Sequence, residues 1–303
     1  MSTLANATPA PADRSGSMAN AAEPKRNRRF AVLASAPLLI KGCLLVILLM
    51  VAVALLAPVL APDDPAHQDL RGRLGSPSAE HWLGNDQLGR DVLSRTLYGA
   101  RISIGVASFG TVVGAIVGSL LGMLSGYLRG RVDMAVMFLV DAQQALPFII
   151  VALVAIAIFG ASIPTLLALV SVAGWEVYAR FARASTLVVR ESQYVLASRC
   201  IGTSEGRILL RHVLPNIISP LIVIATLNIT SLILLESSLS FLGVGVQPPT
   251  PSWGGMISEG RQYLNTAWWI VVGPAAAMVL LTLAISLAGD WLRDVLDPTS
   301  RRR

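Results

Sequence analysis

Long apolar runs alternate with short polar segments along this chain. A helix of roughly 20 apolar residues crosses the ~30 Å hydrocarbon core of a bilayer, and helices satisfy their own backbone hydrogen bonds there. Six stretches have this length and character, at 38–61, 102–127, 134–159, 162–180, 217–242 and 267–289. The pattern therefore predicts an all-α integral membrane protein with six transmembrane helices.

The first run is longer than the apolar core of a signal peptide, which holds about 7–15 residues. We therefore interpret 38–61 as a first transmembrane helix that is not cleaved. The residues before it are rich in Ala, Pro and Ser and then basic (KRNRR). Such a composition offers few large apolar side chains for a core, so we expect a disordered tail over residues 1–37.

The second run carries a glycine at every fourth position. Residues four apart lie on one helix face, and small residues there allow another helix to approach closely. We therefore expect tight helix packing along the ridge formed by Gly110, Gly114, Gly118, Gly122, Gly126 and Gly130.

Composition and charge agree with a membrane protein. Of the 303 residues, 54% are hydrophobic and 14% are charged, against ~25% charged in soluble domains. The net charge of +6 first raises the question of topology, and no nucleic-acid-reading signature accompanies it. If the N-terminus is inside, 18 of the 24 Lys and Arg residues fall on the inside, which predicts cytoplasmic N- and C-termini.

A basic segment, YVLASRCIGTSEGRILLRHVLPN, separates the fourth and fifth runs on the predicted cytoplasmic side. We expect a helix from Glu191 to Ile201, ended by Gly202 in the left-handed conformation. Thr203 or Ser204 then caps a second short helix, which Pro215 ends.

That second helix is expected to have an apolar side and a basic side. Ile208, Leu209, Val213 and Leu214 form the first, and Arg207 and Arg211 lie one turn apart on the second. A rigid amphipathic helix suits docking onto another protein. It equally suits a helix held at the membrane surface by lipid headgroups, and the pattern alone leaves both open.

Three motifs carry a family resemblance. Leu196-Ala197-Ser198, Gly202 and Leu214-Pro215 resemble the EAA loop of ABC importer permeases, although Leu196 replaces a Glu and Ser198 an Ala. LGNDQLGRDVLSRTLYGARISI and LESSLSFLGVGVQPPTPSWGGMI resemble hallmarks of the second, C-type permease subunit of dipeptide, oligopeptide and nickel importers. The resemblance covers roughly residues 30 to 297.

The resemblance implies a MetI-like permease fold in a bacterial inner membrane. It implies a periplasmic segment at 62–101, a core of five transmembrane helices at 102–290 with a coupling loop at 181–215, and a basic cytoplasmic tail at 291–303. Partner ATPases would dock on the coupling loop through Ala197, Ser198, Gly202, Arg207, Arg211, Leu214 and Pro215.

The implied activity is import of di- or oligopeptides, with nickel, glutathione and opine-like solutes as open alternatives. The implied partners are a second permease subunit in a heterodimer, one or two cytoplasmic P-loop ATPases, a periplasmic or lipid-anchored substrate-binding protein and membrane lipid. No cofactor and no nucleic acid is expected.

Two acids within the runs, Asp141 and Glu236, are candidates for the cargo path. A charged side chain at mid-bilayer costs about 2.5–3.5 kcal/mol on insertion scales, so each is expected to face protein or water. We place both, with Phe241 of the LSFLG motif, as path or gate residues. The alternative is a hydrogen bond between helices, or a wet position near the interface.

Other classes of function fit less well. The GTSEG segment (202–206) matches a hydrolase elbow, but that motif needs a preceding strand. The only lysines are Lys25 and Lys41 and no GxxxxGK[ST] occurs, so the chain has no P-loop. Its three histidines have no metal-ligand spacing, so no metal site is expected, and its two cysteines are read as inert. A secondary transporter remains the runner-up.

The outer segments hold a charged motif and a proline-rich loop. Arg90, Asp91 and Arg95 are expected to form a local salt-bridge cluster, with contact to the substrate-binding protein as the alternative. QPPTPSW (247–253) is expected on the same docking face or in an outer lid. Pro147 and Pro220 are expected to kink their helices.

Overall fold

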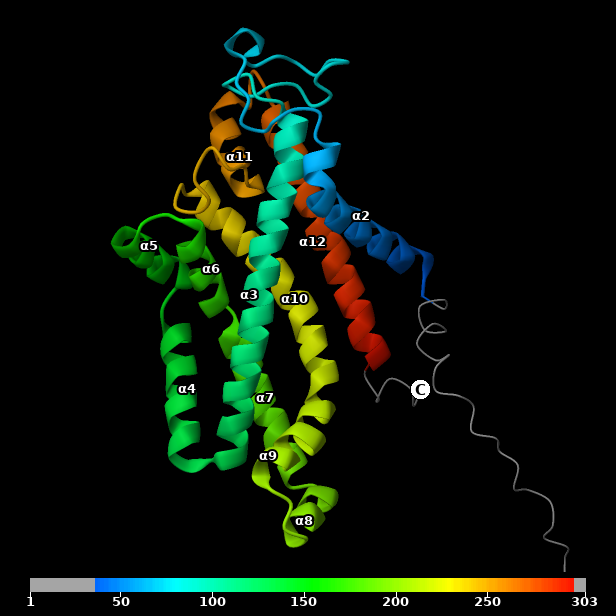
Figure 1. Ribbon diagram of the computed structural model, residues 1–303, viewed down its shortest axis with the longest axis vertical. Coiled ribbons are helices and arrows are strands. Elements are labelled where there is room, and N and C mark those ends of the chain that lie inside the picture. The colour runs from blue at the N-terminus through cyan, green and yellow to red at the C-terminus, as the bar shows by residue number, and fades with distance from the viewer. Residues whose placement is uncertain (1–35, 297–303) are drawn as a thin grey trace, which may run out of the picture. The chain divides into compact units, whose positions relative to one another are not determined.

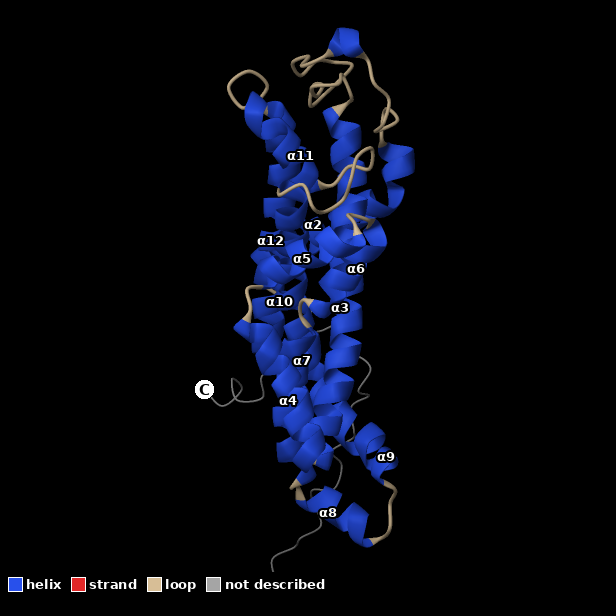
Figure 2. Cartoon of the chain, turned by 90° about the vertical axis from the view of Figure 1, so that its left-hand side faces the viewer, coloured by secondary structure: helices blue, strands red, loops and turns tan. Residues whose placement is uncertain are grey.

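The computed structural model describes residues 36–296. The chain divides into two units, 1–38 and 39–303, and only three residues of the first are described. The expected disordered tail before residue 36 and the basic residues Arg301 to Arg303 lie outside the described residues. The described part is helical and contains no strand, apart from one isolated bridge between Asn85 and Asp91 (Figure 2).

The described helices follow one another with few long connections (Figure 1). In chain order they are α2 (Leu38–Leu60), η1 (Leu70–Gly72), α3 (Val92–Leu128), α4 (Gly130–Ala145), α5 (Phe148–Phe159), α6 (Ile163–Val172), α7 (Trp175–Arg190), α8 (Gln193–Cys200), α9 (Glu205–Ile208), η2 (Leu209–Val213), α10 (Leu214–Phe241), α11 (Trp253–Gly260), η3 (Arg261–Tyr263) and α12 (Trp269–Leu296).

The number of membrane spans agrees with the sequence pattern. Five helices are long and apolar enough to cross a bilayer: 38–60, 92–128, 163–190, 205–241 and 269–296. The pair α4 and α5 makes a sixth when it is counted as one bent span. The all-α fold with six spans is therefore confirmed.

The second span begins ten residues earlier than predicted. The Asp91 carboxylate caps α3 by accepting from the Ser94 backbone N–H at 2.6 Å, which satisfies one of the free N–H groups of the first turn. The helix ends at Leu128, and Gly130 follows with φ 59° and no heavy atom within 4 Å of a built Cβ. Gly130 is therefore outside the glycine ridge, contrary to the sequence prediction.

The third span breaks where only a kink was predicted. The axes of α4 and α5 differ by 91°, and Leu146, at the break, has extended φ and ψ of −109° and 136°. A proline disfavours the helical conformation of the residue before it, so Pro147 ends α4 at that point.

The fourth span also breaks, although the sequence predicted one continuous helix over 162–180. α6 ends before Ala173, and α7 begins at Trp175 and continues to Arg190. Between them, a Cβ built on Gly174 would come within 2.6 Å of Asn228 Nδ2 on α10. The break therefore places backbone directly against α10.

Pro215 does not end its helix, and that prediction was wrong. α9, η2 and α10 are continuous from Glu205 to Phe241, with a π-helical turn over Leu209–Val213 in which the Leu214 N–H bonds to the Leu209 carbonyl. A proline clashes with the carbonyl four residues before it in a regular helix. The wider π turn changes that register immediately before Pro215, so the chain continues.

The glycine ridge of α3 lies directly on the backbone of α6 and α7. A Cβ on Gly118 or Gly122 would overlap the carbonyl oxygens of Trp175 and Ala179. One on Gly126 would come within 2.7 Å of the Arg183 carbonyl. These glycines let the two helices approach until main chain meets main chain.

Candidate functional site

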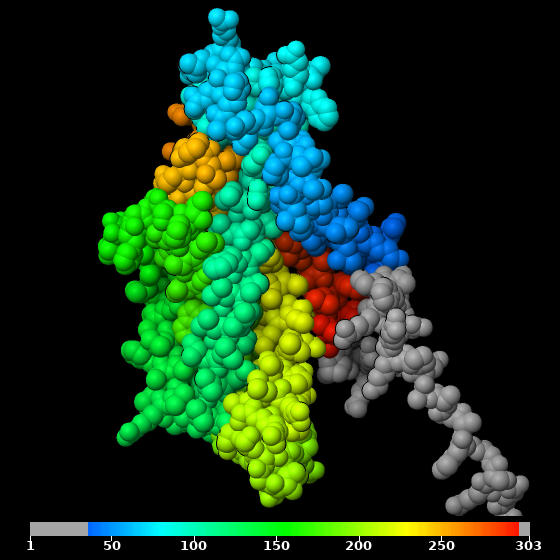
Figure 3. Space-filling view, viewed as in Figure 1, coloured from blue at the N-terminus to red at the C-terminus, as the bar shows by residue number. Residues whose placement is uncertain are grey.

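The loop between α7 and α10 is anchored by buried apolar side chains. Val195 on α8, Ile208 on α9 and Val213 in η2 are each 0% exposed. They pack in one cluster with side chains of α3, α7 and α10, among them Met123 and Tyr127. We call residues 191–213 the elbow, and this packing holds it firmly against the helix ends (Figure 3, yellow-green).

The opposite side of the elbow presents apolar and basic groups outward. Leu196, Ile201 and Leu210 are 47%, 83% and 63% exposed, and Arg207 and Arg211 are also exposed. In the second helix the predicted apolar residues Ile208 and Val213 are buried and the basic residues Arg207 and Arg211 are exposed, but Leu210 is exposed as well. Exposed apolar side chains at a helix-capped turn are typical of an interaction surface.

The turn at Gly202 has the predicted conformation. Its φ is 79°, which glycine adopts without the steric cost of a Cβ. The Gly202 N–H donates to the Arg199 carbonyl and the Thr203 N–H to the Ser198 carbonyl, which closes α8. Ser204 occupies the N-cap position of α9 without a side-chain cap.

One cation–π contact and one hydrogen bond tie the elbow to the rest of the chain. The guanidinium group of Arg199 lies 4.9 Å from the centre of the Tyr127 ring on α3, and that of Arg190, at the end of α7, lies 5.6 Å from the same ring. The amide of Asn216 donates to the Tyr194 hydroxyl at 3.2 Å. A cation–π contact stabilises by about 0.5–1 kcal/mol at an exposed site.

The predicted loop residues take different positions on the elbow. Ala197 and Pro215 are exposed, and Leu214 is half-buried. The Ser198 hydroxyl donates to the Tyr194 carbonyl at 2.8 Å. The outermost apolar group is Ile201, which the motif comparison did not single out. Its position directly before the turn at Gly202 could have indicated from the sequence that this side chain is exposed.

Glu236 on α10 is completely buried in a group of serines. Its carboxylate accepts from Ser240 Oγ at 2.7 Å and Ser237 Oγ at 3.4 Å, and the hydroxyls of Ser103 on α3 and Ser252 before α11 also face it. Ser237 and Ser240 belong to α10, the helix of Glu236 itself, whose side chain is 0% exposed. The carboxylate therefore faces protein, as the sequence analysis expected of an acid within a span.

The LESSLSFLG and PSWGG motifs build this serine site together. Trp253, 0% exposed, donates from Nε1 to the Thr96 carbonyl at 3.0 Å, and its backbone N–H donates to Ser103 Oγ at 3.3 Å. A Cβ on Gly254 would overlap the Ser237 backbone. Phe241 lies at the end of α10 under the Arg261 guanidinium, 5.4 Å from the ring centre.

Asp141 lies on the surface of the chain rather than in its interior. Its carboxylate accepts from Arg180 Nη2 at 2.9 Å, with side chains 71% and 50% exposed. A neighbouring ion pair joins Asp133 to Arg183, whose Nη2 donates at 2.7 Å. Both pairs connect α4 to α7.

Sequence reasoning missed a third acid, Glu176, although it lies within the predicted run 162–180. It is half-buried in the first turn of α7 and accepts from Gln143 Nε2 at 3.0 Å. Gln143 also donates to the Val172 carbonyl at 2.7 Å and accepts from Trp175 Nε1 at 2.6 Å. An acid in an apolar run was the signal that could have found it.

The charged motif before α3 forms the expected salt-bridge cluster, but with different acids. Arg90 Nε donates to Asp86 at 2.6 Å, and both Arg90 and Arg95 donate to Glu259 on α11, at 2.9 and 3.0 Å. Asp91 is not part of this cluster, because it caps α3 and lies 3.2 Å from His81 Nδ1.

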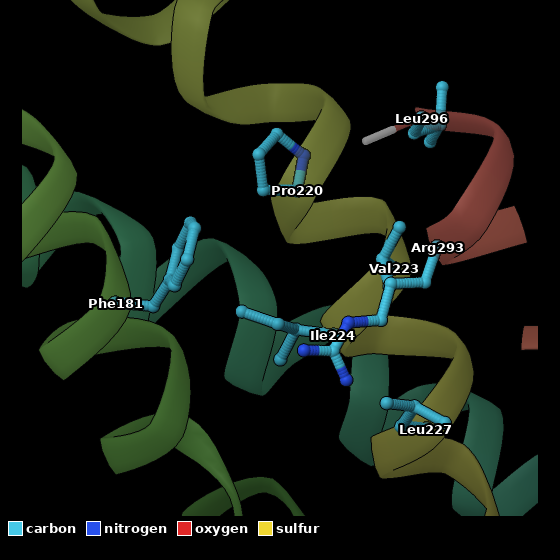
Figure 4. Close-up of a pocket in the computed structure, with 7 residues that line it drawn as sticks. All are labelled: Phe181, Pro220, Val223, Ile224, Leu227, Arg293 and Leu296. Atoms are coloured by element: carbon cyan, nitrogen blue, oxygen red, sulfur yellow. The ribbon is translucent and has the colours of Figure 1, made fainter. Parts of the chain in front are cut away.

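An apolar pocket lies between α7, α10 and α12 (Figure 4). It has a volume of about 490 Å³ and is lined by apolar side chains such as Phe181, Val223 and Leu227. Arg293 reaches from α12 toward α10 and is the one charged side chain among the described residues that line it. The pocket therefore offers an apolar wall and one positive charge.

Comparison with known proteins identifies the family. Residues 118–302 match the family described as "Binding-protein-dependent transport system inner membrane component". The chain belongs to this family. It is accordingly a multi-pass inner-membrane permease subunit of an ATP-binding cassette importer and not itself an enzyme. Such importers work with ATPase and substrate-binding partners.

Named relatives are similar over most of their length. The chain is 42% identical over 263 residues to the di/tripeptide transport system permease protein DppC of Pseudomonas aeruginosa, covering 85% of this chain and 87% of that protein. It is 36% identical to the dipeptide permease DppC of Alkalihalophilus pseudofirmus and 41% identical to the glutathione permease GsiD of Escherichia coli, with 84% of each chain covered.

A solved structure shares the fold. The inward-facing MetNI methionine ABC transporter matches with a TM-score of 0.52 and 20% identity, over 66% of this chain and 95% of that chain. This likeness supports the predicted MetI-like permease fold.

Proposed function

We propose that this permease subunit imports di- or oligopeptides. Two of the named relatives are described as peptide permeases and a third as a glutathione permease, and glutathione is itself a small peptide. A short peptide is the class of cargo common to these relatives. Nickel and opine-like solutes are the alternatives, and competition of each solute with dipeptide uptake distinguishes them.

The elbow is the proposed docking surface for the partner ATPase. The observation that carries this role is the combination of a buried anchor, Val195, Ile208 and Val213, with the exposed groups Ile201 and Leu210 on the other side. A rigid unit transmits movement of its partner to α3, α7 and α10, which alternating access by rigid-body rocking requires.

The proposed orientation follows from this role. The ATPase is cytoplasmic, so the elbow faces the cytoplasm, and the segment 62–91 at the opposite end of α3 faces the periplasmic binding protein (Figure 1). Both termini are then cytoplasmic. The proposed assembly contains a second, different permease subunit and one or two P-loop ATPases.

The experiment uses the complete transporter in proteoliposomes. Ile201→Glu places a charge on a side chain that is 83% exposed, so folding should be retained while ATPase association and ATP-driven dipeptide uptake fall at least tenfold. Ile201→Leu keeps an apolar surface and serves as the control. Uptake by Ile201→Glu at the wild-type rate would contradict docking at the elbow.

The energy source has its own test. Vanadate should abolish dipeptide uptake and a protonophore should leave it unchanged. The opposite result would favour the runner-up, a secondary transporter.

A further inference from the structure

The breaks within the third and fourth spans open onto one polar pocket. The break between α4 and α5 contributes Gln143 and Leu146, the break between α6 and α7 contributes Gly174 and Glu176, and α10 contributes Asn228 from the third side. The pocket volume is about 330 Å³, within the usual range for small-ligand sites, ~300–1,000 Å³. Broken helices form substrate sites in transporters because their free backbone groups face the cavity.

The lining of this pocket combines polar and apolar groups. Leu232, Leu235 and Phe148 supply an apolar wall, and Gln144 and Ser231 add polar groups. Asn228 uses one amide hydrogen on the Tyr178 hydroxyl at 3.2 Å. A peptide-like solute, with an apolar side chain beside amide groups, matches such a lining.

Glu176 gives the pocket an excess of negative charge. Its side-chain hydrogen-bond partner among the described residues is the neutral amide of Gln143, at 3.0 Å. Arg180, one turn further along α7, attracts the carboxylate at longer range, while its own hydrogen bond goes to Asp141 at 2.9 Å. The positive end of the α7 helix stabilises the Glu176 carboxylate, because the residue lies in the first turn.

The Gln143 amide holds the carboxylate in position. Its Nε2 is shared between Glu176 Oε2 and the Val172 carbonyl, and its Oε1 accepts from Trp175. With its amide bonded on both sides, Gln143 is held facing Glu176, and the Glu176 side chain lines the pocket. The apolar pocket of Figure 4 differs in this respect, because its charged group is the cation Arg293.

We infer that Glu176 binds the ammonium group of the peptide-like cargo while that cargo passes through this permease. The inference deepens the proposed function and rests on it. Gln143 is then a positioning residue for Glu176, and the apolar wall accommodates the cargo side chain.

The test measures binding and uptake with the complete transporter. Radiolabelled dialanine is bound at equilibrium to the assembly without binding protein, and its ATP-driven uptake is measured with saturating binding protein. Glu176→Gln keeps the shape and removes the charge, so dialanine affinity should fall roughly tenfold or more, as expected when a charge-assisted hydrogen bond is lost. Glu176→Asp should recover part of it.

Two controls make the result specific. Asp290→Asn removes an exposed carboxylate on α12 and should bind dialanine as the wild type does. N-acetyl-dialanine lacks the ammonium group, so its weak competition should be the same for wild type and Glu176→Gln.

The outcomes separate the two proposals. Dialanine uptake by the wild type together with unchanged affinity and rate in Glu176→Gln would overturn the ammonium site and leave peptide import standing. Stronger discrimination against N-acetyl-dialanine in Glu176→Gln would also overturn it. A wild-type assembly that hydrolyses ATP but neither binds nor imports dialanine would overturn both.

Discussion

Trp175 Nε1 donates a 2.6 Å hydrogen bond to Gln143 Oε1 and so joins α7 to α4. Each residue lies within a few positions of a helix break, at Leu146–Pro147 in one case and at Ala173–Gly174 in the other. The bond therefore fixes the two breaks relative to each other, and the polar pocket with Glu176 lies where they meet.

We expect this bond to couple the two residues energetically. Trp175→Phe and Gln143→Leu should each lower the thermal stability of the purified protein, and the double variant should lose less than the sum. A coupling of about 1 kcal/mol is typical of a hydrogen bond in a protein, and a double-mutant cycle on unfolding measures it. Strict additivity would show that the two side chains do not act together.

Gly122 should tolerate no side chain, because a Cβ there would overlap the Ala179 carbonyl. We expect Gly122→Leu to cost about 3 kcal/mol or more of stability through overpacking, seen as a large drop in melting temperature. Gly105 lies on the same helix with no heavy atom within 4 Å of a built Cβ. Gly105→Leu should leave the melting temperature near that of the wild type; equal losses at both positions would contradict the packing.

Glu259 balances two buried arginines. Arg90 and Arg95 are 3% and 2% exposed and both donate to its Oε2. In Glu259→Gln, Asp86 is left as the carboxylate that neutralises both arginines. Breaking a buried ion pair lowers the free energy of unfolding by about 3–5 kcal/mol. We expect a loss at the lower end of this range, because the Glu259 side chain is 27% exposed. Glu80→Gln, at an exposed carboxylate, is the control, and similar melting temperatures for the two variants would refute the role.

The elbow contains two glycines at which substitution by alanine should have opposite effects on stability. Gly202 has φ 79°, whereas Gly206 lies inside α9, and neither has a heavy atom within 4 Å of a built Cβ. Gly202→Ala should destabilise the elbow by about 1 kcal/mol, because a Cβ disfavours the left-handed conformation. Gly206→Ala should stabilise it by a similar amount. Hydrogen exchange of the elbow amides measures both changes, and equal protection in the two variants would contradict the expectation.

Much of the fold follows from local pattern. The six apolar runs, the left-handed Gly202 and the two sides of the elbow were readable, because burial in lipid and helix capping depend on residues a few positions apart. The π turn before Pro215 was not, since a proline is compatible both with the end of a helix and with a changed register.

The sequence by itself determined the class of this protein: the length and spacing of its apolar runs require membrane-spanning helices, and its motifs place it among importer permeases. The tertiary structure decided which charges meet. Arg90 donates to Glu259, which lies 169 positions away in the sequence. Gly174 leaves room for the Asn228 side chain of a distant helix. Glu176 lines a pocket because two helix breaks lie side by side. The pattern of apolar and polar residues indicates which side chains are buried and which are solvated. Which distant residues then come into contact depends on how the helices pack.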